Sequence, residues 1–558
     1  MLELGLALIL WIPSLWGWGT FLNRRILAPD ETAHELGLGD RGLLGIISIA
    51  SVAIVVHFFI PIYSGVAGAA WLIGIAWFLN AREFWRSFPS RSWTMLGILF
   101  ALIYIAQGSA FNFDNGSYYL PSLVMDRTFA TSVGVGNIQG PLGQSTIWFL
   151  TSAMLWLPGT PLAFPYALNS ILCFFCFLSF FERLSTTSPP ITRLLSIGAI
   201  LLMRFFTPYC GSISPDPSSQ LFVVLTFVSC CEILEDRRLS SRIGLACLYA
   251  LFGLMCKPTA AGASLGVLIT IGIAWNIGTA SKAEIMAIIK SRSGVFLISL
   301  STLWLFRNLL LSGCALFPQK ASCVSLPWTI PKSTLEYYGK DLLFHALPRV
   351  PPNGIWHRSY WRVWFQMTGL HDPLLRFLGR VWALSLLGVL VARIRRLTPL
   401  SRNENQIIAF LFFSSLASAL FFLALVPVVR FATPYLAGLT LALGALAGRR
   451  WLPHWKPTPW IGAGIVFLSL IWAVRGTYLT RVAPVSWIRW PLIPQVKSKV
   501  IRKYDDISLI SPEGEVRCWS LPPPCSTTEI PSTIRSLPGP RLYATPGPRP
   551  KFPWPSPD

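Results

Sequence analysis

Long apolar runs dominate this chain and set narrow limits on its fold. Runs of about 17–22 apolar residues recur along it, and each is long enough to cross a hydrocarbon core of about 30 Å as a helix. Apolar residues fill 53% of the 558 positions and charged residues only 13%, whereas a soluble protein carries about 25% charged residues. The sequence therefore predicts an all-α, polytopic helical membrane protein with about 13–15 membrane segments.

The formal charge of +22 has a topological explanation in such a chain. In a soluble protein, a balance this basic would suggest nucleic acid. Here the Lys/Arg clusters fall in short connections between apolar runs, where they orient the helices by keeping those connections in the cytoplasm. No nucleic-acid partner is expected. The expected partner is the lipid bilayer, where some basic residues meet anionic headgroups or a lipid-borne phosphate.

The alternation of basic and polar connections divides the chain into five parts and places the polar connections on the extracytoplasmic side. The tail is dense in proline and is predicted to be extended or disordered from about residue 536. The parts are N-terminal transmembrane helices (1–92), a membrane core (93–312) with a first outer loop (107–144), an extracytoplasmic loop (313–376), C-terminal transmembrane helices (377–475) and an extracytoplasmic tail (476–558).

One apolar segment, Ser145–Leu162, breaks this alternation. Two apolar runs lie between the outer loop before it and the basic loop after it, where only one crossing fits. Pro158 and Gly159 also interrupt the segment. It is therefore predicted to be a juxtamembrane or re-entrant helix, which is tolerated where it lines a cavity.

The first outer loop holds the strongest candidate for chemistry. It carries Asp114, followed by Asn115, Tyr118 and Tyr119. An ionised carboxylate at a membrane surface can accept a proton from a sugar hydroxyl or hold a metal ion. Neighbouring amide and aromatic side chains suit a polar substrate. The alternative is a turn or helix-capping residue, which an Asp-Asn-Gly sequence also favours.

Further charged residues interrupt or border apolar runs near the same face. Asp216 lies between two prolines directly before an apolar run, where it either forms a carboxylate pair with Asp114 or caps the helix. Lys257 breaks an apolar stretch and either snorkels to the interface or binds a lipid phosphate. Arg307 and Arg430 are either interfacial anchors or phosphate ligands, because arginine binds phosphate in a bidentate manner. Three cations near two acids indicate a phosphorylated substrate.

Four of the eleven cysteines lie in the long outer loops. In an oxidising compartment their short separations favour the bridges Cys518–Cys525 and Cys314–Cys323. The histidines are scattered without metal-ligand spacing, and no metal site is assigned. Neither a Walker loop nor a serine nucleophile elbow occurs in the sequence, so it supports neither nucleotide hydrolysis nor serine chemistry.

The order of these features resembles the integral-membrane glycosyltransferases of the GT-C fold, which use polyprenyl-phosphate-linked sugars. Asp114 matches the acidic residue in their first large outer loop, and Asp216 matches a second acid in a later outer loop. Lys257-Pro258-Thr259 is similar to their Lys-Gly-Pro or Lys-Pro-Thr break. The stretch from Arg430 to Pro434 is similar to their Arg-Tyr-x-x-Pro step.

The chain also resembles a group of large bacterial polytopic membrane proteins. The matching features are the loop from Asp114 to Ser145, the stretch from Arg307 to Pro318, and a Cys-Trp…Pro-Cys ending between Cys518 and Cys525. Together with the GT-C motifs, these short matches are spread over most of the chain between about residues 93 and 526. One departure is that Asn115 follows a single acid where many GT-C enzymes carry two neighbouring acids. A divalent cation, Mg²⁺ or Mn²⁺, is therefore left open as a cofactor.

The resemblance implies a GT-C-like fold and inverting glycosyl transfer from a polyprenyl-phosphate-linked sugar to an extracytoplasmic glycan or lipid acceptor. It implies the bacterial inner (plasma) membrane, with the site on the extracytoplasmic face. The implied roles are base for Asp114, partner acid for Asp216, substrate contacts for Asn115, Tyr118 and Tyr119, and phosphate ligands for Lys257, Arg307 and Arg430.

Two other classes of function remain open at this stage. The first is a transporter, flippase or polymerase of lipid-linked glycans, and the second is a non-catalytic membrane subunit of a larger complex. Convergence of Asp114 and Asp216 near the cations would favour the enzyme, and acids that point apart would remove its support.

Overall fold

The fold is described from a computed structural model of the whole chain. The residues that it describes are 2–27, 36–81, 92–106, 114–144, 146–184, 188–236, 239–277, 281–336, 362, 372–395, 400–425, 428–451, 458–480, 494–504, 507–513, 517–526 and 533–546. Parts of the predicted outer loops (107–113, 337–361 and 363–371) and the last residues of the tail (547–558) lie outside them.

The all-α, polytopic membrane fold is confirmed. Within the described residues, nine helical segments are long and apolar enough to cross a membrane, and four shorter apolar helices accompany them. The long segments contain α1 (Leu2–Leu22), α2 (Leu38–His57), α9 (Leu168–Glu182), α11 (Pro215–Asp236), α13 (Ala261–Asn276), α15 (Arg292–Ser312), α18 (Pro373–Ile394), α19 (Arg402–Leu425) and α20 (Val429–Trp451). The shorter apolar helices are α3 (Ser64–Leu79), α5 (Ser92–Ala106), α12 (Leu239–Cys256) and α21 (Pro459–Thr480).

The remaining elements are shorter and connect or cover these helices. Among them, α7 has 8 residues and is about 12 Å long at 1.5 Å per residue, too short to cross a membrane. Ser145–Leu162 thus contains no membrane-spanning helix among its described residues. The shorter elements are α6 (Leu120–Thr128), α7 (Ile147–Met154), α8 (Ala163–Tyr166), α10 (Pro190–Leu202), α14 (Lys282–Lys290), η1 (Asn23–Leu27), η3 (Asn115–Tyr119), η4 (Val135–Asn137), η5 (Gly140–Gly143), η6 (Met203–Phe205), η7 (Thr207–Tyr209), η8 (Pro258–Ala260) and η9 (Lys320–Ser322).

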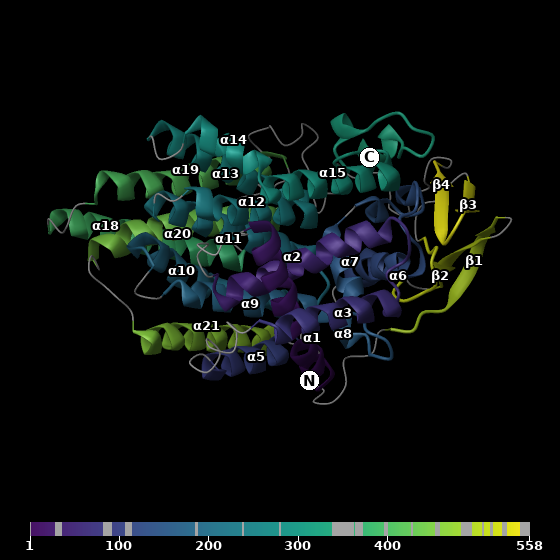
Figure 1. The fold of residues 1–558 in the computed structure, drawn as a ribbon, viewed down its shortest axis with the longest axis horizontal. Helices are drawn as coiled ribbons and strands as arrows, with labels where there is room; N and C mark the ends of the chain where they lie inside the picture. Colours follow the sequence, from purple (N-terminus) through teal and green to yellow (C-terminus); the bar gives the residue numbers. More distant parts are fainter. Residues whose placement is uncertain are drawn as a thin grey trace.

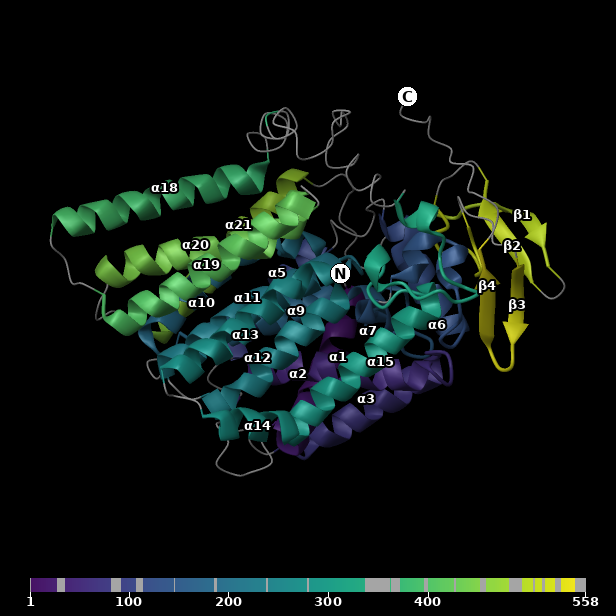
Figure 2. The same ribbon diagram turned by 90° about the horizontal axis from the view of Figure 1, so that it is seen from above.

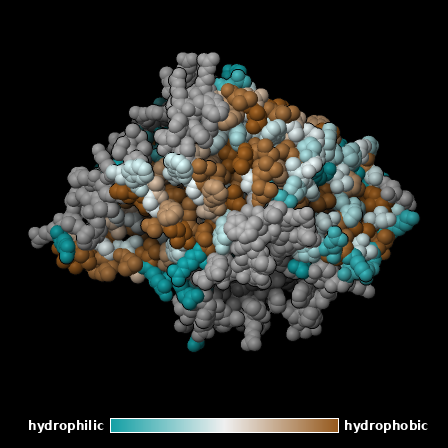
Figure 3. All heavy atoms as spheres, turned by 90° about the horizontal axis from the view of Figure 1, so that it is seen from below, coloured by the Kyte–Doolittle hydropathy of each residue, from teal (hydrophilic) through white to brown (hydrophobic). Residues whose placement is uncertain are grey.

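The surface of the bundle is largely hydrophobic, as expected where helices face lipid. Hydrophobic side chains cover a broad area in the middle of the face shown in Figure 3, and hydrophilic residues gather mainly towards one end. Among the helices, Phe100, Leu268 and Phe413 are each at least 65% exposed. A soluble protein would not expose so much contiguous apolar surface.

Helix α11 runs through the middle of the bundle and positions the site. All of its residues from Pro215 to Leu234 are buried, and it packs against α10, α12, α13 and α20. Its apolar residues surround the helix on all sides, which is typical of a helix enclosed by other helices. Asp216, a candidate site residue, lies in its first turn, and Glu232 lies about 24 Å further along the helix.

A buried ion network holds the helices together at the far end of α11. The Asp40 carboxylate at the start of α2 faces Arg183, with Oδ2 and Nη2 3.0 Å apart. It also accepts hydrogen bonds from Ser179 at 2.7 Å and Tyr249 at 2.9 Å. Arg183 in turn lies 3.4 Å from the Glu232 carboxylate. The network joins α2, α9, α11 and α12, so each charged residue has its ion-pair partner in a distant part of the chain.

The tail forms two antiparallel β-hairpins, and the prediction of disorder from about residue 536 is wrong for the described residues. The strands β1 (Ser498–Lys503) and β2 (Ser508–Pro512) pair with each other, as do β3 (Thr533–Leu537) and β4 (Arg541–Thr545). All four strands lie at one end of the bundle, near α6 (Figures 1 and 2).

Burial explains why the second hairpin is ordered. Ile534, Leu542 and Ala544 are at most 1% exposed and share a core with Ile138 of the first outer loop. β4 also pairs with that loop, because the Val133 N–H donates to the Leu542 carbonyl at 2.8 Å. The high proline content obscured a hairpin signal in the sequence. This signal is a Pro-Gly turn between two segments in which apolar and polar residues alternate.

Candidate functional site

The first part of the site is a single π-helical turn that leads into α6. In η3 the Leu120 N–H donates to the Asn115 carbonyl five residues earlier, which is the π-helical pattern. That period places residues five apart on one side, and the Tyr119 hydroxyl donates to Asp114 Oδ2 at 3.3 Å. The Asp114 side chain makes no capping hydrogen bond, so the helix-cap alternative is not what the structure shows.

The two acids converge with two of the three predicted cations. Asp216, in the first turn of α11, forms an ion pair with Lys257. Arg430, near the start of α20, places Nη1 3.7 Å from Asp114 Oδ2. The start of α11 is capped by Ser214 rather than by Asp216, because the Ser214 hydroxyl accepts a hydrogen bond from the Asp216 N–H at 3.3 Å. Four residues from distant parts of the chain thus form two facing ion pairs.

The local sequence explains how both cations reach the site. Lys257 is the extended residue between α12 and η8, because Pro258 favours extended backbone at the residue before it. Gln220 ties α11 to α20 by donating to the Arg430 carbonyl at 2.7 Å. The Phe431 ring lies beneath both cations, with its centroid 4.5 Å from Lys257 Nζ and 5.2 Å from Arg430 Cζ. Such cation–π contacts orient the two charges.

A chain of hydroxyl groups links the Asp114 carboxylate to the backbone of Asp216. The Asp216 N–H donates to Ser214 Oγ, and Ser214 Oγ donates to the Tyr119 hydroxyl, each at 3.3 Å. Tyr119 then donates to Asp114, and the Tyr118 ring packs edge-on against Tyr119 at 4.5 Å. Burial raises the pKa of both tyrosines, and the nearby carboxylates raise it further. Both hydroxyls therefore stay protonated at neutral pH.

Exposure separates the four charged residues into an inner and an outer pair. The side chains of Asp216 and Lys257 are 8% and 17% exposed, whereas those of Asp114 and Arg430 are 30% and 47% exposed. A substrate can therefore reach Asp114 and Arg430 first. The inner pair is better placed to set the electrostatic field of the site than to react directly.

Two of the predicted substrate contacts lie elsewhere. Asn115 is fully buried and donates to the Tyr166 hydroxyl at 2.9 Å, away from solvent. Arg307 is 3% exposed and faces Asp126, with Nη2 and Oδ1 3.0 Å apart. His57 completes this second cluster at 3.5 Å from the same carboxylate oxygen. Arg307 is therefore paired within the fold, a partner that its sequence position does not reveal.

We expect Arg307→Gln to reduce stability rather than ligand binding. Its loss leaves Asp126 buried without the guanidinium, but burial already raises the pKa of Asp126 to about 6. A proton can therefore neutralise this carboxyl group, and we expect a loss of about 1–3 kcal/mol in unfolding free energy. The melting temperature should fall, while a ligand of the site around Asp114 and Arg430 should bind the folded protein with wild-type affinity. Weakened binding with unchanged melting would return Arg307 to the site.

The two carboxylates do not form a ready metal site. Each already faces a cation, and the described residues contain no group of three His, Cys, Asp or Glu side chains that could hold a metal ion. A divalent cation would have to displace Lys257 or Arg430 to gain two carboxylate ligands. These ion pairs therefore do not fit a bound Mg²⁺ or Mn²⁺.

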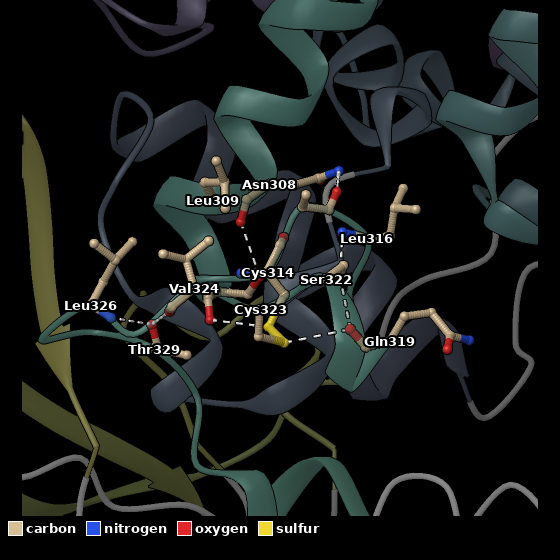
Figure 4. Close-up of a disulfide and its surroundings, with 12 residues drawn as sticks. Asn308, Leu309, Cys314, Leu316, Gln319, Ser322, Cys323, Val324, Leu326 and Thr329 are labelled. Atoms are coloured by element: carbon tan, nitrogen blue, oxygen red, sulfur yellow. Dashed lines mark hydrogen bonds between the residues drawn. A yellow bond between two sulfur atoms is a disulfide. The ribbon is translucent and has the colours of Figure 1, made fainter.

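Both predicted cysteine pairs form disulfides, with Cα–Cα separations of 3.8 Å for Cys314–Cys323 and 6.2 Å for Cys518–Cys525. The first follows Gly313, whose φ of 76° ends α15. Figure 4 shows it surrounded by hydrogen bonds within the loop, including that from Thr329 Oγ1 to the Val324 carbonyl. The second lies against η3 through Trp519, whose backbone N–H donates to the Gly116 carbonyl at 2.9 Å.

Several residues of the site were not predicted from the sequence. Ser214, Gln220 and Phe431 each adjoin or lie close to a predicted residue, and proximity to a charged motif was the available signal. Trp519 gave no such signal, because it lies some 400 residues from Gly116 along the chain. Only the folded structure brings it to the site.

Comparison with known proteins adds a family and a distant structural likeness. No curated protein matches the chain. A solved structure that is similar is the single-particle cryo-EM structure of arabinosyltransferase EmbB from Mycobacterium smegmatis, with 16% sequence identity and a TM-score of 0.37. The match covers 68% of this chain and 34% of the arabinosyltransferase, so this chain spans about a third of that protein's length. The family model described as Domain of unknown function (DUF8201) matches residues 1–437. Because this match covers most of the chain, the protein belongs to that family.

Proposed function

We propose that this protein is a GT-C-like membrane glycosyltransferase that moves a sugar from a polyprenyl-phosphate donor to an extracytoplasmic glycan or lipid acceptor in the bacterial inner membrane. The observation that supports this most is the convergence of Asp114, Asp216, Lys257 and Arg430 at the start of the buried helix α11. An acid and a cation that are both accessible, backed by a buried pair, match the needs of sugar transfer from a lipid phosphate.

The proposed reaction is a direct displacement at the anomeric carbon of the sugar. The acceptor oxygen forms a bond to this carbon while the bond to the phosphate oxygen breaks. Asp114 takes the proton of the acceptor hydroxyl as general base. The leaving polyprenyl phosphate gains negative charge, which Arg430 and Lys257 stabilise. Attack opposite the leaving group inverts the anomeric configuration.

The geometry of the outer pair suits these two roles, with Asp114 as the base and Arg430 as a ligand of the phosphate. The 3.7 Å between Arg430 and Asp114 is longer than a hydrogen bond, so the guanidinium can turn towards a phosphate. Tyr119 holds Asp114 through its hydroxyl and keeps one carboxylate oxygen oriented. No step uses a divalent cation, because the carboxylates already face the cations that would stabilise the phosphate.

The surroundings suit a donor that arrives within the membrane. Lys257 lies at the break between α12 and α13, and Arg430 lies at the start of α20, all three of which are apolar helices. A lipid-borne phosphate at the membrane surface would therefore meet the cations while its chain stays in hydrocarbon. A soluble nucleotide sugar would gain nothing from this placement.

The direct test measures free polyprenyl phosphate, a product that does not depend on the sugar or acceptor. Purified protein in lipid nanodiscs would be incubated with a panel of polyprenyl-phosphate sugars and total envelope glycans, and the product quantified by mass spectrometry. Release with at least one donor supports the transferase. Binding of the donors without release would instead favour a carrier of lipid-linked glycans.

We expect Arg430→Gln to weaken binding of a polyprenyl phosphate without lowering the melting temperature. Loss of a hydrogen bond to a charged group costs about 1.5–3 kcal/mol, or roughly 10- to 150-fold in affinity. The residue is exposed, so folding should change little. The matched control is Arg535→Gln, an exposed arginine that stacks on Tyr543 in the second hairpin. Wild-type affinity in the Arg430 variant would remove this residue from the site.

A further inference from the structure

The disulfide loop of the tail lies directly against the candidate site. Besides its hydrogen bond to Gly116, Trp519 is 2% exposed and belongs to the same buried cluster as Tyr119. Cys518 immediately precedes it, and the bridge to Cys525 closes the loop. The proposed reaction assigns no role to this loop, although it contacts the turn that presents Asp114.

The π-helical turn needs a donor from outside because a proline follows it. In a π-helix the Gly116 carbonyl would accept from the N–H of residue 121, but Pro121 has none. The Leu120 N–H, which an α-helix would use, is already bonded to Asn115. The backbone N–H of Trp519 supplies this hydrogen bond, so the buried Gly116 carbonyl is not left unsatisfied.

The next two carbonyls of the turn are satisfied in a similar way. Gln139 Nε2 of the first outer loop donates to the Ser117 carbonyl at 3.0 Å. The Ser122 hydroxyl donates to the Tyr118 carbonyl at 2.6 Å. The conformation of the turn is thus set by groups outside its own ladder, and of these Trp519 comes from the most distant part of the chain.

The contact between the ring and the turn is tight. A Cβ atom at Gly116 would lie 2.5 Å from the Trp519 ring, so only glycine fits there. Trp519 has a φ of 48° and is the only non-glycine residue with positive φ in the described parts of the chain. This conformation is unfavourable for a bulky side chain and persists only where the surroundings impose it. Cys525 supplies part of this constraint, because it pairs with Ile510 of β2.

We propose that Trp519, held by the Cys518–Cys525 bridge, is a positioning residue that fixes the π-helical turn and so directs Asp114 towards the acceptor. This inference rests on the proposed function. Trp519 does not line the accessible part of the site and acts only through Gly116 and the turn. The disulfide loop of the tail is then a component of the site, and transfer depends on the oxidised bridge.

The test compares rate, binding and local order in the full-length protein. Trp519→Ala keeps the backbone N–H but removes the ring that packs against Gly116, so the turn is free to shift. We expect this variant to lower the rate of polyprenyl phosphate release by about 10- to 100-fold, because small misplacements of a reacting group cost that much. Affinity for polyprenyl phosphate should stay within a few-fold, since the cations are untouched. Trp519→Phe should restore most of the rate. A spin label at Ser117→Cys should become more mobile in the Trp519→Ala protein and stay immobilised in the Trp519→Phe protein.

The other disulfide provides the matched control. Replacing both Cys518 and Cys525 by serine should lower the rate as Trp519→Ala does, whereas the same change at Cys314 and Cys323 should not. The proposal is overturned if Trp519→Ala leaves rate and label mobility unchanged, or if both serine pairs lower the rate equally.

The two hypotheses fail in different ways. If wild-type protein releases no polyprenyl phosphate from any donor, the proposed transferase fails. The spin label then decides the structural part independently of activity. An immobilised label in the Trp519→Ala protein would show that the turn does not depend on Trp519.

Discussion

Asp114→Asn is expected to abolish transfer while leaving insertion and folding intact. The substitution keeps the shape of the side chain and its ability to accept from Tyr119, but it removes the negative charge and the capacity to take a proton. General-base assistance is worth about 10²–10⁴ in rate. The side chain is partly exposed and makes no capping hydrogen bond, so stability should change little. The measurement is polyprenyl phosphate release in nanodiscs together with the melting temperature.

A matched carboxylate separates this effect from a general loss of negative charge. Glu336 pairs with Lys320 in the loop after α15, and both side chains are more than half exposed. Glu336→Gln removes the same charge from a loop position away from the ion pairs of the site and should leave the rate unchanged. A rate within a few-fold of wild type in the Asp114→Asn protein would show that Asp114 is not the base.

Arg183→Met is expected to cause the largest loss of stability. The guanidinium is buried between Asp40 and Glu232, and methionine keeps much of the length without the charge. Removing one member of a buried ion pair costs about 3–5 kcal/mol, because the remaining charge stays out of water. The melting temperature in detergent micelles should fall strongly, and the protein that stays folded should keep its transfer rate.

The double variant distinguishes an unpaired charge from lost packing. Adding Asp40→Asn to Arg183→Met removes both charges and should recover part of the lost stability. Lys320→Gln, in the exposed pair with Glu336, should change the unfolding free energy by no more than about 0.5 kcal/mol. An unchanged melting temperature in Arg183→Met would contradict a structural role for the network.

The membrane character of the chain follows from local sequence. A helix satisfies its own backbone hydrogen bonds, so a long apolar run suffices to predict a helix in lipid. The same reasoning identified Ser145–Leu162 as unable to span, because an alternation of loops allows only one crossing there. It failed for the tail, where Ile534 and Leu542 owe their order to a core shared with the first outer loop.

The charged residues show where sequence reasoning stops. Asp114, Asp216, Lys257 and Arg430 were identified as candidates from their positions beside apolar runs and from a family resemblance. Their pairing was not predicted, and neither cation has an acidic partner nearby in sequence. Arg307 satisfied the same positional criteria, yet it faces Asp126 in a separate buried cluster. Position along one helix does not specify which neighbour a side chain meets.

The sequence by itself therefore determined that the protein lies in a membrane, that its fold is helical, and which polar segments could hold a site. These depend on interactions within one segment and between that segment and lipid. The tertiary structure decided the rest: the carboxylate that each cation meets, the enclosure of Arg307, and the contact of Trp519 with Gly116. Such pairings depend on how separate helices and loops pack together, because a buried charge or carbonyl must find its partner in space rather than along the chain.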